Sequence, residues 1–290
     1  MINLEFGQIF KLMRPKQWIK NFFVFAAMIF SGKFTSTYIL IMNIFVFIMF
    51  CLISSSVYVL NDLVDVSKDR QHPQKKNRPI ASGKVTKFQA ILVEIILLAV
   101  VFIISYNINL RLLAVFLIYF IMNVLYSFKL KNIIIVDVMI ITFGFVLRVE
   151  SGSILTNVQL SPWMILCTIL ISLFMALNKR KSEIITLKDK SGAHRKILDE
   201  YSVELIDNML TIVTPSILIA YCLYTFSSIQ SRTMMITIPF VLYGIFRYQY
   251  LMMKNNIGGK PEDVFQKDIP FLINIILWAV VVISIIYFKL

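Results

Sequence analysis

The sequence predicts an all-α membrane protein that crosses the bilayer many times. Hydrophobic residues make up 58% of its 290 positions, whereas about half of the residues of a soluble domain are apolar. The mean hydropathy is +0.79, and apolar runs of roughly 20 residues, the length that a helix needs to cross a bilayer, recur along the chain. These observations exclude an ordinary soluble domain. They also argue against nucleic-acid binding, because no soluble basic segment is long enough to support it.

Nine apolar segments are predicted to span the membrane as one helical bundle, a single domain over residues 1–290. The first has the shortest apolar core, Phe22 to Phe30, so Lys20 and Asn21 must lie near membrane depth and face protein rather than lipid. A cleaved signal peptide is the alternative for this segment, but no strong small-residue cleavage site follows it. The predicted spans are residues 18–32, 37–60, 87–106, 110–128, 133–152, 162–180, 207–227, 232–252 and 269–288.

The fifth predicted span carries two charged residues, Asp137 and Arg148. They lie 11 residues apart, close to three helical turns, so they point the same way and should face the interior of the bundle. Arg148 sits deep in the span, which is costly without a partner. It either closes a structural network or forms the floor of a polar cavity, and the sequence leaves both readings open.

The charge distribution predicts the orientation. The net charge is +13, and if the N-terminus is cytoplasmic, most of the 29 Lys and Arg residues fall on the cytoplasmic side, as the positive-inside rule requires. The long polar segments 61–86, 181–206 and 253–268 then form a cytoplasmic cap, where loops on a rigid scaffold commonly carry function. We therefore predict a multi-pass protein of the cell membrane whose chemistry faces the cytoplasm.

An acidic cluster follows directly after the second predicted span. Asp62, Asp65 and Asp69 occur at positions i, i+3 and i+7, so in a helix they would share one face. Clustered acids at the end of a membrane helix repel one another unless a cation joins them, and oxygen ligands suit Mg²⁺. Asp62 and Asp65 are the primary candidate ligands, with Asn61 beside them and Asp69 completing the shell through water. The alternative is a solvated helix end paired with nearby basic residues.

A basic cluster follows the sixth predicted span. Lys179 and Arg180 stand where a membrane helix enters the cytoplasm, so they can hold phosphate oxygens, and Arg180 offers a bidentate fork. Lys179 and Glu183 are i and i+4 and share a helical face. Snorkelling to the membrane surface is the alternative for these cations. A third polar loop ends in Pro261, Glu262 and Asp263, a pattern typical of a helix start that could meet an anion.

The motif Asn61-Asp62-x-x-Asp65-x-x-x-Asp69-Arg70 resembles the signature of the UbiA superfamily of intramembrane prenyltransferases. Ordinary members carry a second aspartate-rich motif after the sixth span, where this chain has the basic cluster. One acidic and one basic cluster suit a donor with an additional phosphate. Further motifs resemble the members that transfer phosphoribose to polyprenyl phosphates, and the resemblance covers nearly the whole chain: Arg14 to Asn21, Asp69 to Pro73, Arg78 to Ala81, Lys179-Arg180 with Glu183, and Gly259 to Asp263.

The resemblance implies a Mg²⁺-dependent transfer of 5-phosphoribose from phosphoribosyl diphosphate to a polyprenyl phosphate lipid, for cell-wall biosynthesis. Asp62 and Asp65 would hold the metal, Lys179 and Arg180 would clamp donor phosphates, and Lys20 and Arg14 would receive the lipid phosphate. The predicted catalytic residues are Asp62, Asp65 and Asp69; the predicted metal ligands are these three and Asn61; the predicted substrate-binding residues are Arg14, Lys20, Asn61, Arg70, Arg78, Arg148, Lys179, Arg180, Glu183, Tyr201, Arg247 and Asp263.

Two other functions are weighed against this one. A conventional prenyltransferase would join a prenyl diphosphate to an aromatic or glycerol-type acceptor, and the absence of a second acidic motif argues against it. A cation-coupled transporter should carry acids across the whole membrane, whereas nearly all acids of this chain are placed on the cytoplasmic side, with Glu150 the main exception. Homo-oligomerisation stays open, because an aliphatic lipid-facing surface carries no signature of it.

Overall fold

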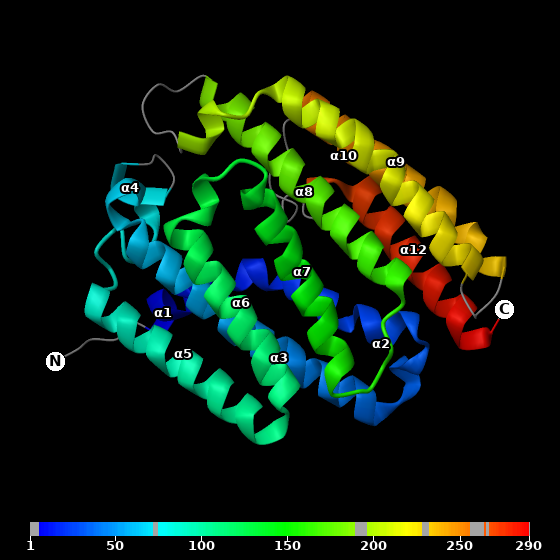
Figure 1. Ribbon diagram of the computed structural model, residues 1–290, viewed down its shortest axis with the longest axis horizontal. Helices are drawn as coiled ribbons and strands as arrows, with labels where there is room; N and C mark the ends of the chain where they lie inside the picture. The colour runs from blue at the N-terminus through cyan, green and yellow to red at the C-terminus, as the bar shows by residue number, and fades with distance from the viewer. Residues whose placement is uncertain are drawn as a thin grey trace.

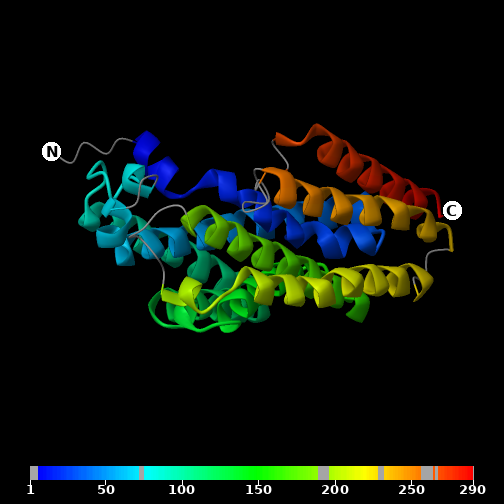
Figure 2. The ribbon, with the colours of Figure 1, turned by 90° about the horizontal axis from the view of Figure 1, so that it is seen from above.

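The computed structural model describes residues 6–71, 75–188, 196–227, 232–255, 264 and 267–289. Figure 1 shows the long helices packed as one bundle, most of them tilted in the same general direction. Seen from above, the N-terminal segment and α4 lie at one end of the bundle and the C-terminus lies at the other (Figure 2). The described residues contain no strand, so the all-α prediction is confirmed.

Long α-helices alternate with short α-helical and 3-10 (η) connections. In chain order the elements are α1 (Phe6–Leu12), η1 (Pro15–Phe25), α2 (Ala26–Phe30), η2 (Lys33–Thr35), α3 (Thr37–Val64), α4 (Val66–Gln71), η3 (Lys75–Asn77), α5 (Lys87–Ile108), α6 (Leu110–Phe128), η4 (Leu130–Asn132), α7 (Val136–Ile154), α8 (Pro162–Lys188), η5 (Lys196–Asp199), α9 (Val203–Ser227), η6 (Arg232–Thr237), α10 (Ile238–Asn255) and α12 (Ile269–Phe288).

Within the described residues, 6 helices are long and apolar enough to cross a membrane: α3, α5, α6, α8, α9 and α12. They correspond to predicted spans, and the multi-pass helical architecture is therefore shown. The predicted span at 133–152 forms α7, which is less apolar because it carries Asp137, Arg148 and Glu150. The predicted span at 232–252 forms η6 and α10. The total of nine spans stays a prediction.

The first predicted span differs from a continuous α-helix. Pro15 begins the 3-10 helix η1, and only the five residues of α2 are α-helical. Arg14, just before η1, has φ 54°, a left-handed conformation that turns the chain sharply at this point. Asn21 is fully buried, and its side-chain amide donates to Ser54 Oγ at 3.2 Å. The prediction that Asn21 faces protein is confirmed.

Helix α7 lies between the two halves of the hydrophobic core (Figure 1). Its residue Leu147 packs with residues of α3, α5 and α6, whereas Val138 packs with residues of α8, α9, α10 and α12. Gly152 lets η1 approach closely, because a Cβ atom at this position would lie 1.9 Å from the Val24 carbonyl oxygen. Helix α7 thereby fixes η1, the segment that carries Lys20.

The cytoplasmic end predicted for α3 is held by a small apolar cluster. Leu12 of α1, Val59 of α3, Val66 of α4 and Ile80 are all buried and pack together. Helix α3 continues to Val64, past the predicted end of its span. The last turn of α3 is therefore rigid, and it presents the first polar residues of the acidic cluster from a fixed helical backbone.

Candidate active site

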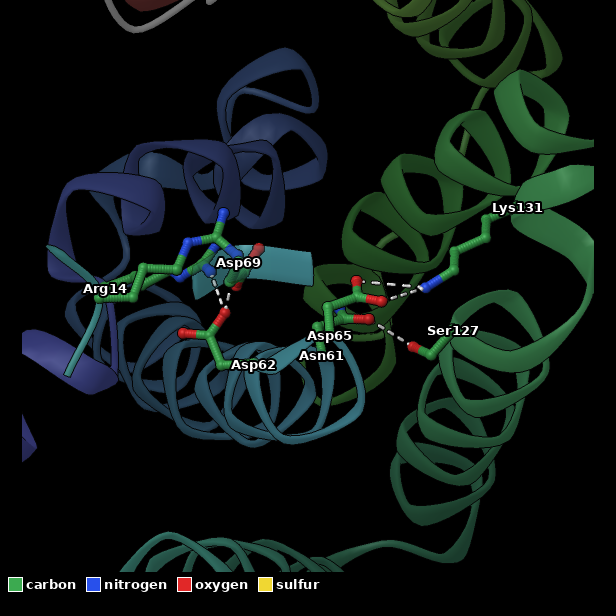
Figure 3. A network of polar contacts seen from close by, with 8 residues as sticks. Arg14, Asn61, Asp62, Asp65, Asp69, Ser127 and Lys131 are labelled. Carbon is green, nitrogen blue, oxygen red and sulfur yellow. Dashed lines mark hydrogen bonds and ion pairs between the residues drawn. The ribbon is translucent and has the colours of Figure 1, made fainter. Parts of the chain in front are cut away.

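The acidic cluster is divided between two sides of the α3 end. Asn61 and Asp62 lie in the last turn of α3, Asp65 is its C-terminal cap, and Asp69 lies in α4. Figure 3 shows Asp62 and Asp69 pointing toward Arg14, whereas Asn61 and Asp65 point the other way, toward α6 and η4. The expectation that all three acids share one face is therefore wrong for Asp65. The physical reason is that cations from different elements draw the carboxylates apart.

On one side, Asp62 and Asp69 meet two arginines. Arg14 forms an ion pair with Asp62 Oδ1, and its guanidinium carbon lies 5.1 Å from the centre of the Tyr58 ring. Arg78 donates to Asp62 Oδ1 at 3.0 Å and to Asp69 Oδ2 at 2.6 Å. Both carboxylates are buried, and buried charges are tolerated when they are paired and hydrogen-bonded. The two arginines thus make this half of the cluster stable without any further ion.

On the other side, Asn61 and Asp65 meet Ser127 of α6 and Lys131 of η4. Ser127 Oγ donates to Asn61 Oδ1. The Lys131 ammonium, on a buried side chain, donates to both oxygens of Asp65, at 2.9 and 3.2 Å. Sequence reasoning does not find Ser127 or Lys131, because a serine within an apolar span and a lone basic residue in a short loop are common features of membrane proteins.

A divalent cation at the acidic cluster would need ligands beyond these side chains. Among the described residues, no group of three or more His, Cys, Asp and Glu side chains could hold a metal ion by itself. The three carboxylates and their three basic partners also balance in charge. Mg²⁺ is usually bound through one or two carboxylates together with substrate phosphates, rather than by a cage of protein ligands alone. The Asn61 and Asp65 oxygens, which point to the same side, supply oxygen donors of that kind.

Arg180 is the centre of a buried network, not an open phosphate ligand. Its side chain is fully buried. Nε donates to Asp137 Oδ2 at 2.6 Å, Nη1 pairs with Glu183, and Nη2 donates to the Tyr126 hydroxyl at 3.1 Å. Asp137 also accepts from the Tyr201 hydroxyl at 2.7 Å. The side chain predicted to clamp phosphate therefore holds α7, α8 and the segment before α9 together.

Lys179, the neighbour of Arg180, has different surroundings. It forms no ion pair or hydrogen bond with any side chain in the described part of the chain. It lies close enough to Lys20, Arg180 and Glu183 to interact with each of them electrostatically. Lys20 of η1 and Lys179 of α8 thus share their surroundings with Glu183, whose carboxylate offsets part of the repulsion between the two ammonium groups. The structure brings together Lys20 and Lys179, which are 159 positions apart in the sequence.

A strained turn connects η4, which carries Lys131, to α7, which carries Asp137. Ile135 has φ 67°, which is unusual for a β-branched residue, and the Val136 N–H donates to the Ile134 carbonyl at 2.7 Å across the turn. The Ile135 N–H donates to the Tyr201 hydroxyl at 2.8 Å. Burial, and the bond that Tyr201 donates to Asp137, raise the pKa of Tyr201 above its ordinary value. Tyr201 therefore stays protonated and holds the turn between η4 and α7.

Arg148 closes a structural network. It is buried and donates to Asn21 Oδ1 at 2.8 Å, to the Gly144 carbonyl at 2.7 Å and to the Tyr119 hydroxyl at 2.9 Å. Three aromatic rings surround its guanidinium within about 5 Å. Of the two readings that the sequence leaves open, the structure supports the structural one, because each guanidinium nitrogen has a protein partner.

The remaining predicted residues lie away from these contacts. Arg247 pairs with Asp268 through two hydrogen bonds, at 3.0 and 2.8 Å, and Asp268 caps α12. Arg70 is exposed and donates to the Ala81 carbonyl at 3.3 Å. Asp263 lies outside the described residues, as do parts of the three predicted cap segments.

Two cavities open among the polar residues. The first, about 280 Å³, lies on the arginine side of the acidic cluster. The second, about 390 Å³, lies between α8, α9 and α10 beside the Lys181–Asp207 ion pair. The first cavity is lined by Lys11, Arg14, Asp62, Asn77, Arg78 and Pro79.

Comparison with known proteins decides the family. The chain matches the UbiA prenyltransferase family over residues 21–286. It belongs to this family. Two curated relatives are named decaprenyl-phosphate phosphoribosyltransferase. The one from Mycolicibacterium smegmatis is 32% identical, with 99% of this chain and 94% of the relative covered. The one from Corynebacterium glutamicum is 31% identical, with 98% and 88% covered. This UbiA-family chain is thus an enzyme, a transferase with membrane helices.

Solved structures confirm the UbiA fold. A UbiA homolog from Archaeoglobus fulgidus, bound to GPP and Mg²⁺, superposes with a TM-score of 0.73 at 17% identity and covers 96% of this chain and 99% of its own. The apo structure of a homolog from Aeropyrum pernix K1 superposes with a TM-score of 0.63 at 12% identity, with 99% and 98% covered. The UbiA-family fold predicted from the acidic motif is therefore shown.

Proposed function

We propose that this protein transfers 5-phosphoribose from phosphoribosyl diphosphate to a polyprenyl phosphate and releases diphosphate, at the cytoplasmic face of the cell membrane. The relatives of that name, aligned over almost the whole chain, support the reaction. The observation that carries the proposal is this alignment, which covers 99% of the chain and 94% of the first relative. Lys179 stands where a second acidic motif would put a carboxylate, and an ammonium group there suits a substrate phosphate.

A divalent cation, Mg²⁺ in our proposal, would be held by Asn61 and Asp65. It would supply charge compensation for the leaving diphosphate. The fold shared with a relative solved with Mg²⁺ and the shared orientation of these two side chains (Figure 3) support this assignment. Lys131, which now pairs with Asp65, would yield one or both carboxylate oxygens when the donor binds with its cation.

The lipid phosphate would lie between Lys20 and Lys179. Lys20 belongs to η1, where the neighbouring apolar side chains Ile19 and Phe22 are 38% and 59% exposed. A polyprenyl chain could follow this apolar edge and deliver its phosphate to the two ammonium groups. Arg180 would position Lys179 without contacting the phosphate, because its bonds to Asp137 and Glu183 fix the end of α8.

The reaction needs little acid–base chemistry from the protein. A phosphate monoester with a second pKa of about 6 is mostly dianionic at pH 7, so the lipid phosphate oxygen can attack the anomeric carbon directly. The C1–O bond to diphosphate breaks, and diphosphate leaves with the bond electrons. The protein's task is to bring two anions together in the correct geometry and to offset the charge of the leaving group.

A conventional prenyl transfer is the second candidate, because the Archaeoglobus relative was solved with GPP. That reaction would place a prenyl diphosphate at the acidic cluster and an aromatic or glycerol-type acceptor beside it. An assay with a prenyl diphosphate and 4-hydroxybenzoate separates this candidate from the proposal.

The proposal is tested by incubating purified protein in detergent with radiolabelled phosphoribosyl diphosphate, a polyprenyl phosphate and Mg²⁺. We expect label in the organic phase, its loss with EDTA, and a loss of at least about a hundredfold in the Asp65→Asn variant, the scale of several kcal/mol of metal charge stabilisation. A matched Glu204→Gln variant, in the first turn of α9, should transfer normally. Full activity of Asp65→Asn would remove Asp65 from the metal site.

A further inference from the structure

We propose that the cavity between α8, α9 and α10 binds a phosphatidylethanolamine-type lipid, an amphiphile whose headgroup carries one phosphate and one primary ammonium. Lys181 of α8 would take the phosphate, and Asp207 of α9 would take the ammonium. The site is separate from the proposed transfer reaction, and no substrate of that reaction is assigned to it.

The cavity lies on the face of α8 that points away from the surroundings of Lys20. Asn178 and Lys181 line the cavity, whereas Lys179 and Glu183 interact with each other, and Lys179 also with Lys20. An α-helix turns by about 100° per residue, so these two pairs of α8 residues point roughly 150° apart. A ligand in the cavity would therefore not occupy the candidate active site.

The polar wall of the cavity carries one cation and one anion, and each can make further bonds. Lys181 Nζ donates to Asp207 Oδ1 at 2.5 Å, which leaves two of the three N–H donors of the ammonium. Asp207 Oδ2 accepts no hydrogen bond within the described part of the chain, and its side chain is 47% exposed, so the carboxylate is open to a ligand. A phosphate alone would be repelled by Asp207, whereas a headgroup with a phosphate and an ammonium complements both charges.

Helix α9 adds a backbone acceptor to the wall. Pro215 lies within α9 and has no N–H, so the Thr211 carbonyl lacks its usual helical donor. Thr211 and Pro215 both line the cavity. A carboxylate and a freed carbonyl favour a ligand with N–H donors. A primary ammonium has three such donors, and the trimethylammonium of phosphatidylcholine has none.

The cavity opens toward the bilayer. Met253 lines it and is 81% exposed, and Ile212, next to the lining residue Thr211, is 71% exposed on a helix that is long and apolar enough to cross a membrane. Exposed apolar surface of this kind contacts lipid tails. From Asp207 to Pro215 the α9 wall is about 12 Å long, and the cavity volume is about 390 Å³, which suits a headgroup and the first carbons of its acyl chains.

The test measures lipid binding to the purified full-length protein by native mass spectrometry. Phosphatidylethanolamine, phosphatidylcholine and phosphatidylglycerol are compared with identical acyl chains. Geranyl phosphate and free phosphoethanolamine are the competitors, because the first has no ammonium and the second has no apolar chain. Asp207→Asn and Lys181→Gln each remove one charge, and both variants should fold, since so exposed an ion pair contributes little to stability. Glu204→Gln is the matched control, because Glu204 is an exposed acid on α9 that does not line the cavity.

We expect phosphatidylethanolamine to bind at least about tenfold more tightly than the other two lipids, the effect of one charge-assisted hydrogen bond. Asp207→Asn should abolish its advantage over phosphatidylcholine. Lys181→Gln should weaken all three lipids about tenfold, because they share the phosphate, and Glu204→Gln should bind like the wild type. Equal affinity for the three lipids, an unchanged preference in Asp207→Asn, or displacement of the lipid by an equal concentration of either competitor would each overturn the assignment.

The transfer assay separates this inference from the proposed function. Normal transfer of labelled phosphoribose by a protein without a preference among the three lipids would overturn the lipid site and leave the reaction standing. An Asp207-dependent preference for phosphatidylethanolamine in a protein that transfers no phosphoribose would support the lipid site and refute the reaction.

Discussion

Loss of charge at Arg180 should lower the stability of the protein, whereas loss of charge at its neighbour Lys179 should weaken substrate binding. Arg180 is fully buried and bonds to Asp137, Glu183 and Tyr126. Arg180→Gln would leave Asp137 buried with only its bond from the Tyr201 hydroxyl, and breaking a buried ion pair in this way costs about 3–5 kcal/mol. At about 2–4 °C per kcal/mol for a chain of this size class, the melting temperature should fall by roughly 10 °C.

Lys179→Gln should leave stability nearly unchanged, because Lys179 makes no ion pair or hydrogen bond in the described chain. It should instead raise the KM for the polyprenyl phosphate about tenfold, the loss of one charge-assisted hydrogen bond. Thermal unfolding in detergent and transfer kinetics, run on both variants, make the comparison. An Arg180→Gln protein with wild-type stability and a raised KM would refute the assignment of Arg180 to the structural network.

Three other perturbations test separate parts of the structure. Gly152→Ala should destabilise the protein by about 1–3 kcal/mol, because the new Cβ would lie 1.9 Å from the Val24 carbonyl oxygen; unchanged thermal unfolding would contradict the close approach of η1 and α7. Lys131→Gln should strengthen Mn²⁺ binding about tenfold, measured by electron paramagnetic resonance, because it removes the cation that competes for Asp65; weaker binding would speak against that competition. Hydrogen bonds from Arg247 hold the pKa of Asp268 below its usual range. The pair therefore stabilises the fold fully above a pH of about 4, and this contribution is lost as the pH falls through the lower pKa of the folded state. Asp268→Asn should remove this part of the acid sensitivity, and a pH profile of unfolding identical to that of the wild type would exclude a contribution from the pair.

The helices were predictable because their signal is local. An apolar run such as Tyr38 to Leu60 is long enough by itself to indicate a membrane-spanning helix. Helix α5 begins at Lys87, the predicted residue, because Thr86 and Gln89 form a capping box. The acidic motif was also visible, since three acids directly after an apolar run are rare. These features depend on residues within a few positions of one another.

The partners of the site residues could not be predicted in the same way. Lys131 and Asp65 are separated by 66 residues, and which carboxylate a lysine meets depends on how helices pack. Arg180 has a sequence environment almost identical to that of Lys179, yet one is fully buried and the other is not. The 3-10 helix η1 was missed because its apolar residues also fit an α-helix, and its geometry depends on packing against α3 and α7.

The most direct test offers the purified protein two donors at once. Phosphoribosyl diphosphate and geranyl diphosphate are supplied with a polyprenyl phosphate, 4-hydroxybenzoate and Mg²⁺, and the lipid products are separated by mass spectrometry. We predict a single product, the polyprenyl phosphate that has gained phosphoribose, and no product in the presence of EDTA. A prenylated aromatic product without any phosphoribosylated lipid would contradict the proposed reaction and assign the site to prenyl transfer.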